Sequence, residues 1–293
     1  MDTKIYQLGA TSILLRPGPV TLVEDGAIET FQRDTLGMDD PIVIQGIEAD
    51  LSFLRQWEPS VYTGGYELRH NAGRSFLLNH WMTKRFAYGV YFDELHSDLP
   101  LKIYCSPEAV PELRISPLRL MASVGLHHRM LRRRSGVLHA SYIGYKGRAI
   151  LFAAPSQVGK STQAELWRRY AGAEVINGDR ALLYPVGDKW YAGGYFTSGS
   201  SGICRNVRLP LAAIILLEQG PDNALWHATE KEGIHCLLSG LESFHWDVED
   251  LDLALSLAGE LARELPILHF RCTPEEEAVT VLRNELEIRG ILC

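Results

Sequence analysis

The residues whose types and spacing could do chemistry are concentrated between positions 149 and 162, which read AILFAAPSQVGKST. The second half of this stretch follows the pattern of a phosphate-binding loop, in which a small residue and four free positions precede Gly, Lys and Ser or Thr. We therefore expect a nucleoside triphosphate to be held by Ala154, Pro155, Ser156, Gln157, Val158, Gly159, Lys160, Ser161 and Thr162.

Each residue of such a loop has an expected task. Backbone N–H groups and the start of the following helix cradle the phosphates. Lys160 would reach the β- and γ-phosphates, and Ser161 would hold Mg²⁺. Ala154 stands where glycine is usual, and it is still small enough to let a ligand approach the backbone closely.

A second reactive group follows the next short apolar strand, Glu174 to Ile176, which ends at Asn177-Gly178-Asp179-Arg180. An acidic residue at the tip of a strand beside a phosphate loop can hold Mg²⁺ or take a proton from an attacking hydroxyl. Asp179 is therefore the candidate base and metal partner, and a structural turn aspartate is the alternative.

The Gly/Ser-rich segment GGYFTSGSSGICRN, residues 193 to 206, is too long for a simple hairpin turn. Loops of this length are uncommon without a role. We interpret the segment as mobile and lying over the site, with Arg205 able to neutralise phosphate charge. A surface loop with no chemical role is the alternative.

The elements that must position these residues follow from apolar patterning. Strands are expected at residues 137–143, 148–153, 211–217 and 267–272, and helices at 160–170, 229–241, 250–264 and 274–287, with Thr273 as a helix cap. Residues 1–112 contain short strands broken by turns, whose aromatic residues we expect mainly in a core. A further helix is expected from Ser116-Pro117 through Leu131. We predict an α/β (α+β) protein with a β-rich domain at 1–112 and a domain at 113–293 that carries the phosphate loop.

Composition excludes several functional classes. The chain has 293 residues, 46% of them apolar, and a formal net charge of −7. A general nucleic-acid binder needs a basic surface, so no nucleic-acid partner is expected. The sequence contains no signal-peptide pattern and no apolar run long enough for a transmembrane helix, so a cytoplasmic protein without a membrane partner is expected. The five cysteines have no metal-ligand spacing.

The order of these motifs resembles that of HPr kinase-like proteins. The resemblance covers residues 135–285 and rests on a His-bearing strand, APSQVGKST, a strand ending in GDR, the Gly/Ser loop with its arginine, and PLAAIILLEQG. It is strongest to the branch found as accessory kinases in peptide-natural-product clusters, including those for lasso peptides. The family implies a phosphoenolpyruvate carboxykinase-related fold, with a mixed central sheet flanked by helices.

The resemblance also implies an activity: transfer of the γ-phosphoryl group of ATP, with Mg²⁺, to a serine hydroxyl. Lys160 and Ser161 would bind ATP and Mg²⁺, Asp179 would be the general base, His139 would help to order the phosphoryl site, and Arg205 would face the transferred group. The chain has Gly178 where these kinases have a second acid, so the resemblance does not imply the reverse reaction.

Three functions stay open from the sequence. The first is a Ser/Thr kinase acting on a peptide or small protein, such as a biosynthetic precursor peptide, which the β-rich half would present. The second is a kinase for a small metabolite, and the third is a nucleotide-gated binding module without turnover. A homo-oligomer is left open, because proteins of this family often assemble as oligomers.

Overall fold

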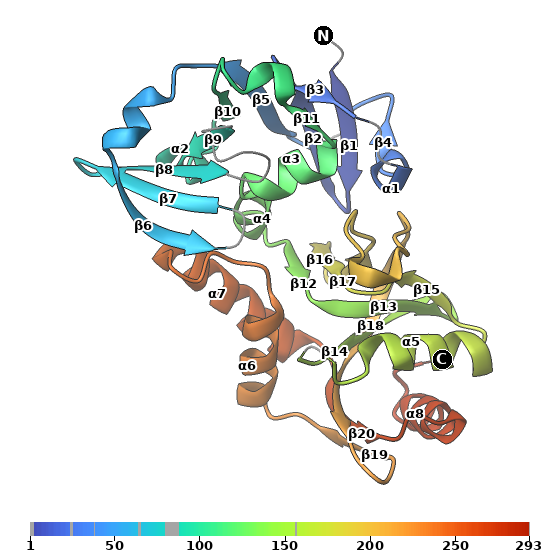
Figure 1. The fold of residues 1–293 in the computed structure, drawn as a ribbon. Coiled ribbons are helices and arrows are strands. Elements are labelled where there is room, and N and C mark those ends of the chain that lie inside the picture. Colours follow the sequence, from blue (N-terminus) through green and yellow to red (C-terminus); the bar gives the residue numbers. More distant parts are fainter. Residues whose placement is uncertain are drawn as a thin grey trace. The chain divides into compact units, whose positions relative to one another are not determined.

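The computed structural model describes residues 3–23, 26–37, 39–63, 66–79, 88–155 and 157–292, except for the side chains of residues 62, 63 and 200. The chain divides into two compact units, Met1–Arg129 and Met130–Cys293. Both contain helices and sheets with parallel and antiparallel strand pairs, consistent with the α/β class (Figure 1). Among the described residues, none of the helices has the length and apolar character needed to cross a membrane.

The first unit is built around a nine-stranded mixed sheet of order β4-β1-β2-β5-β10-β9-β8-β7-β6, with a separate parallel pair, β3 and β11. Its elements are β1 (Lys4–Leu8), β2 (Thr11–Arg16), β3 (Thr21–Leu22), α1 (Gly26–Glu29), β4 (Gln32–Arg33), β5 (Ile42–Glu48), η1 (Ser52–Gln56), β6 (Glu58–Thr63), β7 (Tyr66–Asn71), β8 (Arg74–Asn79), β9 (Tyr88–Tyr91), α2 (Phe92–Leu95), β10 (Leu101–Cys105), η2 (Val110–Glu112), β11 (Arg114–Ile115) and α3 (Pro117–Ser123). The aromatic residues Trp57, Phe76 and Tyr88 are buried in it, as expected, whereas Trp81 and Phe86 lie outside the described residues.

The division between the units falls later in the chain than the expected boundary at 112/113. Contacts of α3 explain the difference, because the hydroxyl groups of Ser123 and Tyr88 are hydrogen-bonded at 2.8 Å. Ser116 caps α3 as expected, by accepting a bond from the N–H of Arg119. The helix expected to continue to Leu131 is interrupted at Gly125, whose φ is +75°, and resumes as α4 (Leu126–Leu131).

The second unit has a mixed sheet of order β12-β16-β17-β18-β14-β13-β15, with β20 pairing β18 and β19 pairing β20. Its elements are β12 (Gly136–Leu138), β13 (Ala140–Tyr145), β14 (Arg148–Ala153), α5 (Lys160–Tyr170), β15 (Glu174–Asn177), β16 (Ala181–Val186), β17 (Lys189–Gly193), η3 (Gly199–Ser201), β18 (Arg208–Gln219), β19 (Ala224–His227), α6 (Glu230–Gly240), α7 (Val248–Glu264), β20 (Ile267–Cys272) and α8 (Glu276–Ile288). Strand β14 runs parallel to β18, and β18 runs parallel to β20.

Both faces of this sheet are covered, which follows from the alternation of side chains along β14. Ile150 and Phe152 point into a core closed by α5 and α8, and Leu151 points into a core closed by α6 and α7 (Figure 1). Helix α6 begins with a capping box between Thr229 and Glu232. Helices packed on both faces of the sheet hold the ends of β14 and β15 in fixed positions.

Two expected elements differ from the structure. Helix α8 begins after Glu275, and Thr273 does not cap it; its hydroxyl group and its N–H both donate to Asn223 Oδ1, at 3.4 Å and 3.0 Å. The single strand expected over 137–143 is two strands: β12 pairs with β16, and β13 pairs with β14 and β15. His139 lies at the break between them, where its N–H donates to the carbonyl of Gly240 at 2.8 Å.

Candidate functional site

The expected phosphate loop connects the end of β14 to the start of α5. Gly159 precedes the helix with a φ of +118°, a conformation that favours glycine. Gln157 also has a positive φ, +69°. Left-handed residues in such a loop turn successive N–H groups toward one concave side, which favours anions. Ser156 lies outside the described residues, and the other residues of the expected loop lie between the strand and the first turn of α5.

Lys160 is the first residue of α5, and only 7% of its surface is exposed. Its ammonium group donates to the carbonyl oxygens of Ala154 at 2.9 Å and Pro155 at 3.3 Å. Burial lowers its pKa below the ordinary 10.5, and the negative charge of Asp179 opposes this shift. The charge is therefore held inside the loop and close to Asp179.

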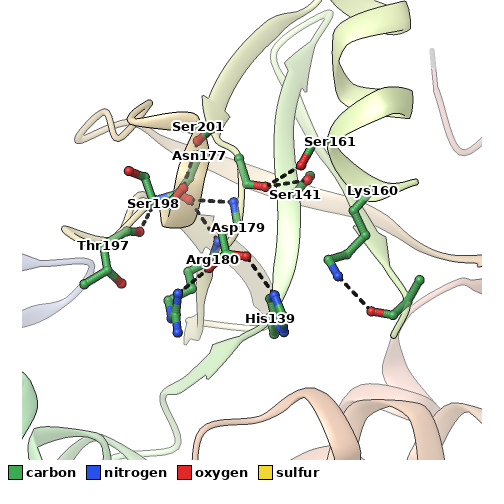
Figure 2. A network of polar contacts seen from close by, with 12 residues as sticks. His139, Ser141, Lys160, Ser161, Asn177, Asp179, Arg180, Thr197, Ser198 and Ser201 are labelled. Atoms are coloured by element: carbon green, nitrogen blue, oxygen red, sulfur yellow. Dashed lines mark hydrogen bonds and ion pairs between the residues drawn. The ribbon is translucent and has the colours of Figure 1, made fainter. Parts of the chain in front are cut away.

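The turn that follows β15 is tied to this loop through the carbonyl of Gly178. That oxygen accepts hydrogen bonds from Ser141 Oγ of β13 at 2.7 Å and from Ser161 Oγ of α5 at 3.4 Å. Figure 2 shows both hydroxyl groups converging on it, with Asp179 next along the chain. The two serines thus bring the tip of β15 beside the first turn of α5.

Asp179 lies in a chain of charged side chains (Figure 2). Its Oδ1 is 2.7 Å from His139 Nε2, and its Oδ2 accepts a bond from the guanidinium of Arg180. Arg180 Nε also donates to Glu242, which follows α6, at 2.5 Å. Burial alone would lower the pKa of Arg180, but the carboxylates of Glu242 and Asp179 raise it overall. The structure brings His139, Lys160, Ser161 and Asp179 together, and the roles that the resemblance implies for them stay predictions.

Asn177 fixes the shape of this turn, and sequence reasoning missed it. The residue is fully buried, and its Oδ1 accepts bonds at 2.9 Å from the N–H groups of Asp179 and Arg180. Its Nδ2 donates at 2.8 Å to the carbonyls of Tyr195 and Thr197. The signal available in the sequence was an Asn before Gly at a strand end, a residue that commonly bonds to the backbone of the following turn.

The Gly/Ser segment is anchored at both ends and is not a free loop. The N–H of Gly194 bonds to the carbonyl of Val207, the N–H of Arg205 bonds to that of Ile176, and Tyr195 and Phe196 are buried. Its middle lies directly on Asp179. A Cβ added to Gly199 would lie 2.8 Å from Asp179 Cγ.

The Gly/Ser segment packs against position 178, where the kinases that the sequence resembles have an acid. A Cβ added to Gly178 would lie 2.3 Å from Ser201 Oγ and 2.6 Å from Ser201 Cβ. A side chain at position 178 therefore does not fit while Ser201 of the Gly/Ser segment packs there. A second carboxylate, that of Glu242, accepts a bond from Arg180, which also contacts Asp179.

Arg205 is not part of this cluster. Its guanidinium pairs with Glu174 at the start of β15, and both side chains are about half exposed. The arginine at Asp179 is Arg180, which follows Asp179 directly in the sequence. The charge-neutralising role of Arg205 stays a prediction, and Arg180 is the arginine that contacts Asp179 in the structure.

Cavities lie on two sides of the loop. One of about 330 Å³ is lined by Val158, Gly159, Thr162, Gln163, Gln219, Gly220, Cys272, Thr273 and Pro274. The other, of about 300 Å³, is lined by Leu138, His139, Ala153, Ala154, Pro155, Cys236, Ser239 and Gly240. His139 thus borders the second cavity and bonds to Asp179.

Comparisons with known proteins add little to this geometry. Neither a family model nor a curated protein matches the chain. Among solved structures, the chain is similar to the Hpr(Ser) kinase/phosphatase from Coxiella burnetii, with 14% identity and a TM-score of 0.30 over 53% of this chain and 99% of that one. A match at this level establishes neither a shared fold nor a shared activity, so the function has to be argued from the site itself.

Proposed function

We propose that this protein is an ATP- and Mg²⁺-dependent kinase with a phosphate-loop domain of the HPr kinase-like class. It would transfer the γ-phosphoryl group to a serine or threonine hydroxyl of a peptide or small protein. The observation that carries the proposal is the bond from Ser161 Oγ to the carbonyl of Gly178. This bond joins the loop that carries Lys160 to the turn that carries the Asp179 carboxylate. Phosphoryl transfer needs a phosphate-binding loop and a carboxylate close together.

The loop would bind the phosphates through its N–H groups and through Lys160. The ammonium group now donates to two loop carbonyls, and it would exchange them for phosphate oxygens, which are stronger acceptors. Ser161 and Asp179 offer oxygen donors at adjoining positions, which suits a hard cation, and Mg²⁺ held there would supply charge compensation to the phosphates. The cavity beside Thr162 would take the nucleoside.

Asp179 would receive the proton of the acceptor hydroxyl as the new bond forms. His139 and Arg180 hold one carboxylate oxygen each and so fix its orientation. Arg180 would also balance charge on the transferring group, while Glu242 holds the arginine in place. Most of the catalysis would come from positioning and from this fixed charge, as is usual in phosphoryl transfer.

The finer parts of the proposal concern partners. The β-rich first unit would present the acceptor, and a biosynthetic precursor peptide in the cytoplasm is the acceptor class that we propose. The cavity beside His139 is lined by no Asp or Glu among the described residues, which favours a peptide over a metabolite that carries an ammonium group.

The test is transfer of label from γ-labelled ATP with Mg²⁺ into size-fractionated extract of the source cells. Wild type should label peptides or proteins, and Asp179→Asn should slow transfer by about 100-fold or more while leaving ATP binding largely intact. Asp188→Asn, in an exposed turn, is the matched control and should behave as wild type. An Asp179→Asn variant with unchanged turnover would refute the assigned role.

A second candidate, a nucleotide-gated binding module, has one observation in its favour. Both oxygens of Asp179 are already engaged, one by His139 and one by Arg180. Tight ATP binding without release of ADP, in the presence of the same extract, would support this candidate over the kinase.

A further inference from the structure

The cavity of about 300 Å³ that borders His139 is here called the α6 pocket, and one of its walls has no role in the phosphoryl transfer proposed for the site. Cys236, Ser239 and Gly240 from the C-terminal half of α6 form it. The carbonyl of Gly240 accepts the N–H of His139, and the N–H of Glu242 bonds to the carbonyl of Val137, so backbone bonds fix helix and strand to each other.

The lining of the α6 pocket carries no Asp, Glu, Lys or Arg among its described residues. Its polar groups are the imidazole of His139, the thiol of Cys236 and the hydroxyl of Ser239, which itself bonds to the carbonyl of Cys236 at 2.8 Å. Burial raises the pKa of the Cys236 thiol above its ordinary 9.0, so the thiol stays neutral. Lys160 interacts electrostatically with the Cys236 thiol, so a carboxylate or phosphate placed here would meet a positive charge, whereas an ammonium group would lose water without gaining a counter-charge, which is costly.

The position of the pocket connects it to the reacting groups. Ala154 and Pro155 form its edge on the loop side, and their carbonyls hold the ammonium group of Lys160. His139 forms another edge and bonds to Asp179. Its volume is at the small end of the range for small-molecule sites, about 300–1,000 Å³. One short side chain with its adjoining backbone matches this space.

We propose that the α6 pocket is the acceptor subsite, and that it takes the hydroxyl side chain of an uncharged, internal segment of a polypeptide and excludes free amino acids and other metabolites that carry an ammonium group. The proposal rests on the proposed kinase function and deepens it. Cys236 and Ser239 are assigned to contact the acceptor, and His139 to face its hydroxyl group.

The transfer balances with this placement. The acceptor oxygen forms a bond to the γ-phosphorus, and the bond from that phosphorus to the β,γ-bridging oxygen breaks, so that the electron pair leaves with ADP. The hydroxyl proton passes to the hydrogen-bonded pair of Asp179 and His139. No oxidant, reductant or further reactant is needed.

The first test compares two acceptors on the wild-type protein, so it does not depend on a variant folding. The probes are an N-acetylated, C-amidated Ala-Ser-Ala tripeptide and free L-serine, which offer the same hydroxyl without and with charged termini. With γ-labelled ATP and Mg²⁺, label should enter the tripeptide at least about 10-fold faster, because the free amino acid must bury an unpaired ammonium charge. The proposal is overturned if free serine is labelled as fast as the tripeptide or faster, or if neither acceptor is labelled.

The second test fills the pocket. Cys236→Leu should reduce label transfer into the tripeptide by about 100-fold, since a small displacement of the acceptor from the γ-phosphate is enough for such a loss. ATP affinity, measured by equilibrium titration with a fluorescent ATP analogue, should stay close to that of wild type. His235→Leu, an exposed residue next to it on α6 and not part of the lining, is the matched control.

The outcomes distinguish failure of the acceptor subsite from failure of the proposed kinase activity. Unchanged tripeptide labelling by Cys236→Leu overturns the subsite while the kinase stands. A wild-type protein that binds no ATP overturns the kinase and the subsite together.

Discussion

Asn177 offers the most direct test of how the site is built. The replacement Asn177→Ala removes an amide that is fully buried and that makes four hydrogen bonds to the backbone. Two of the bonds shape the turn of Asp179, and two hold the segment that lies on it. The substitution therefore breaks the connection between β15 and residues 195–197 at its centre.

The expected cost follows from these bonds. Each contributes a net of about 1 kcal/mol, and a buried group left without a partner costs about 1–3 kcal/mol. Water can reach the backbone of Asp179 and Arg180, which are partly exposed, but not that of Tyr195, which is buried. We expect a loss of about 4 kcal/mol in the free energy of unfolding, above the usual range of about 0.5–3 kcal/mol for a point mutation.

The assay should report on the second unit alone, because a chain of two units need not unfold in one transition. Native-state hydrogen exchange of the N–H of Ile214, which is buried in β18 and bonds to the carbonyl of Pro266, provides this reading. Asn284→Ala, an exposed position in α8, is the control and should change stability by less than about 0.5 kcal/mol. A loss below about 1 kcal/mol for Asn177→Ala would refute the reasoning.

Three further predictions concern neighbouring residues. Burial lowers the pKa of Lys160 in the folded state below 10.5. At pH values between the folded and the unfolded pKa the unfolded chain binds more protons, so the free energy of unfolding of wild type should rise relative to that of Lys160→Met as the pH increases through this interval. Thermal melts from neutral to alkaline pH check this. Gly178→Ala should lower the free energy of unfolding by about 1–3 kcal/mol, because the new methyl group clashes with Ser201. In a double-mutant cycle, adding Ser201→Gly should recover most of this loss, whereas additive losses would contradict the packing. Arg205→Ala should change the unfolding free energy by no more than about 0.5 kcal/mol, since its pair with Glu174 is exposed, and a drop in phosphoryl transfer larger than that of Arg180→Ala would restore Arg205 to the site.

The sequence was sufficient for the parts of the site that depend on local order. A short apolar strand, a glycine-lysine pair and a following helix are consecutive, so β14, the loop and α5 could be predicted from spacing alone. The strand before Asp179 was predicted for the same reason. The family resemblance, and not any periodicity, implied a role for His139 in ordering the phosphoryl site, and its bond to Asp179 was not predicted.

The remaining features depend on contacts between distant residues. Arg180 and Glu242 are 62 positions apart, and nothing in either local sequence indicates that they pair. Arg205 was assigned to the site because its loop was expected to be free, but backbone bonds to β15 turn its side chain toward Glu174. Likewise, the break at His139 arises because its N–H bonds to α6, about a hundred residues later.

The central claim is that the loop between β14 and α5 binds a nucleoside triphosphate through Lys160. Calorimetric titration with ATP and Mg²⁺ tests it, using wild type, Lys160→Met and, as a control, Lys146→Met, which removes an exposed pair with Glu287 and a cation–π contact with Tyr145. Wild type and Lys146→Met should bind ATP equally, and Lys160→Met should bind about 10- to 100-fold more weakly, the loss expected for hydrogen bonds to a charged group. Equal affinity of Lys160→Met and wild type, or no binding by wild type, would contradict the account.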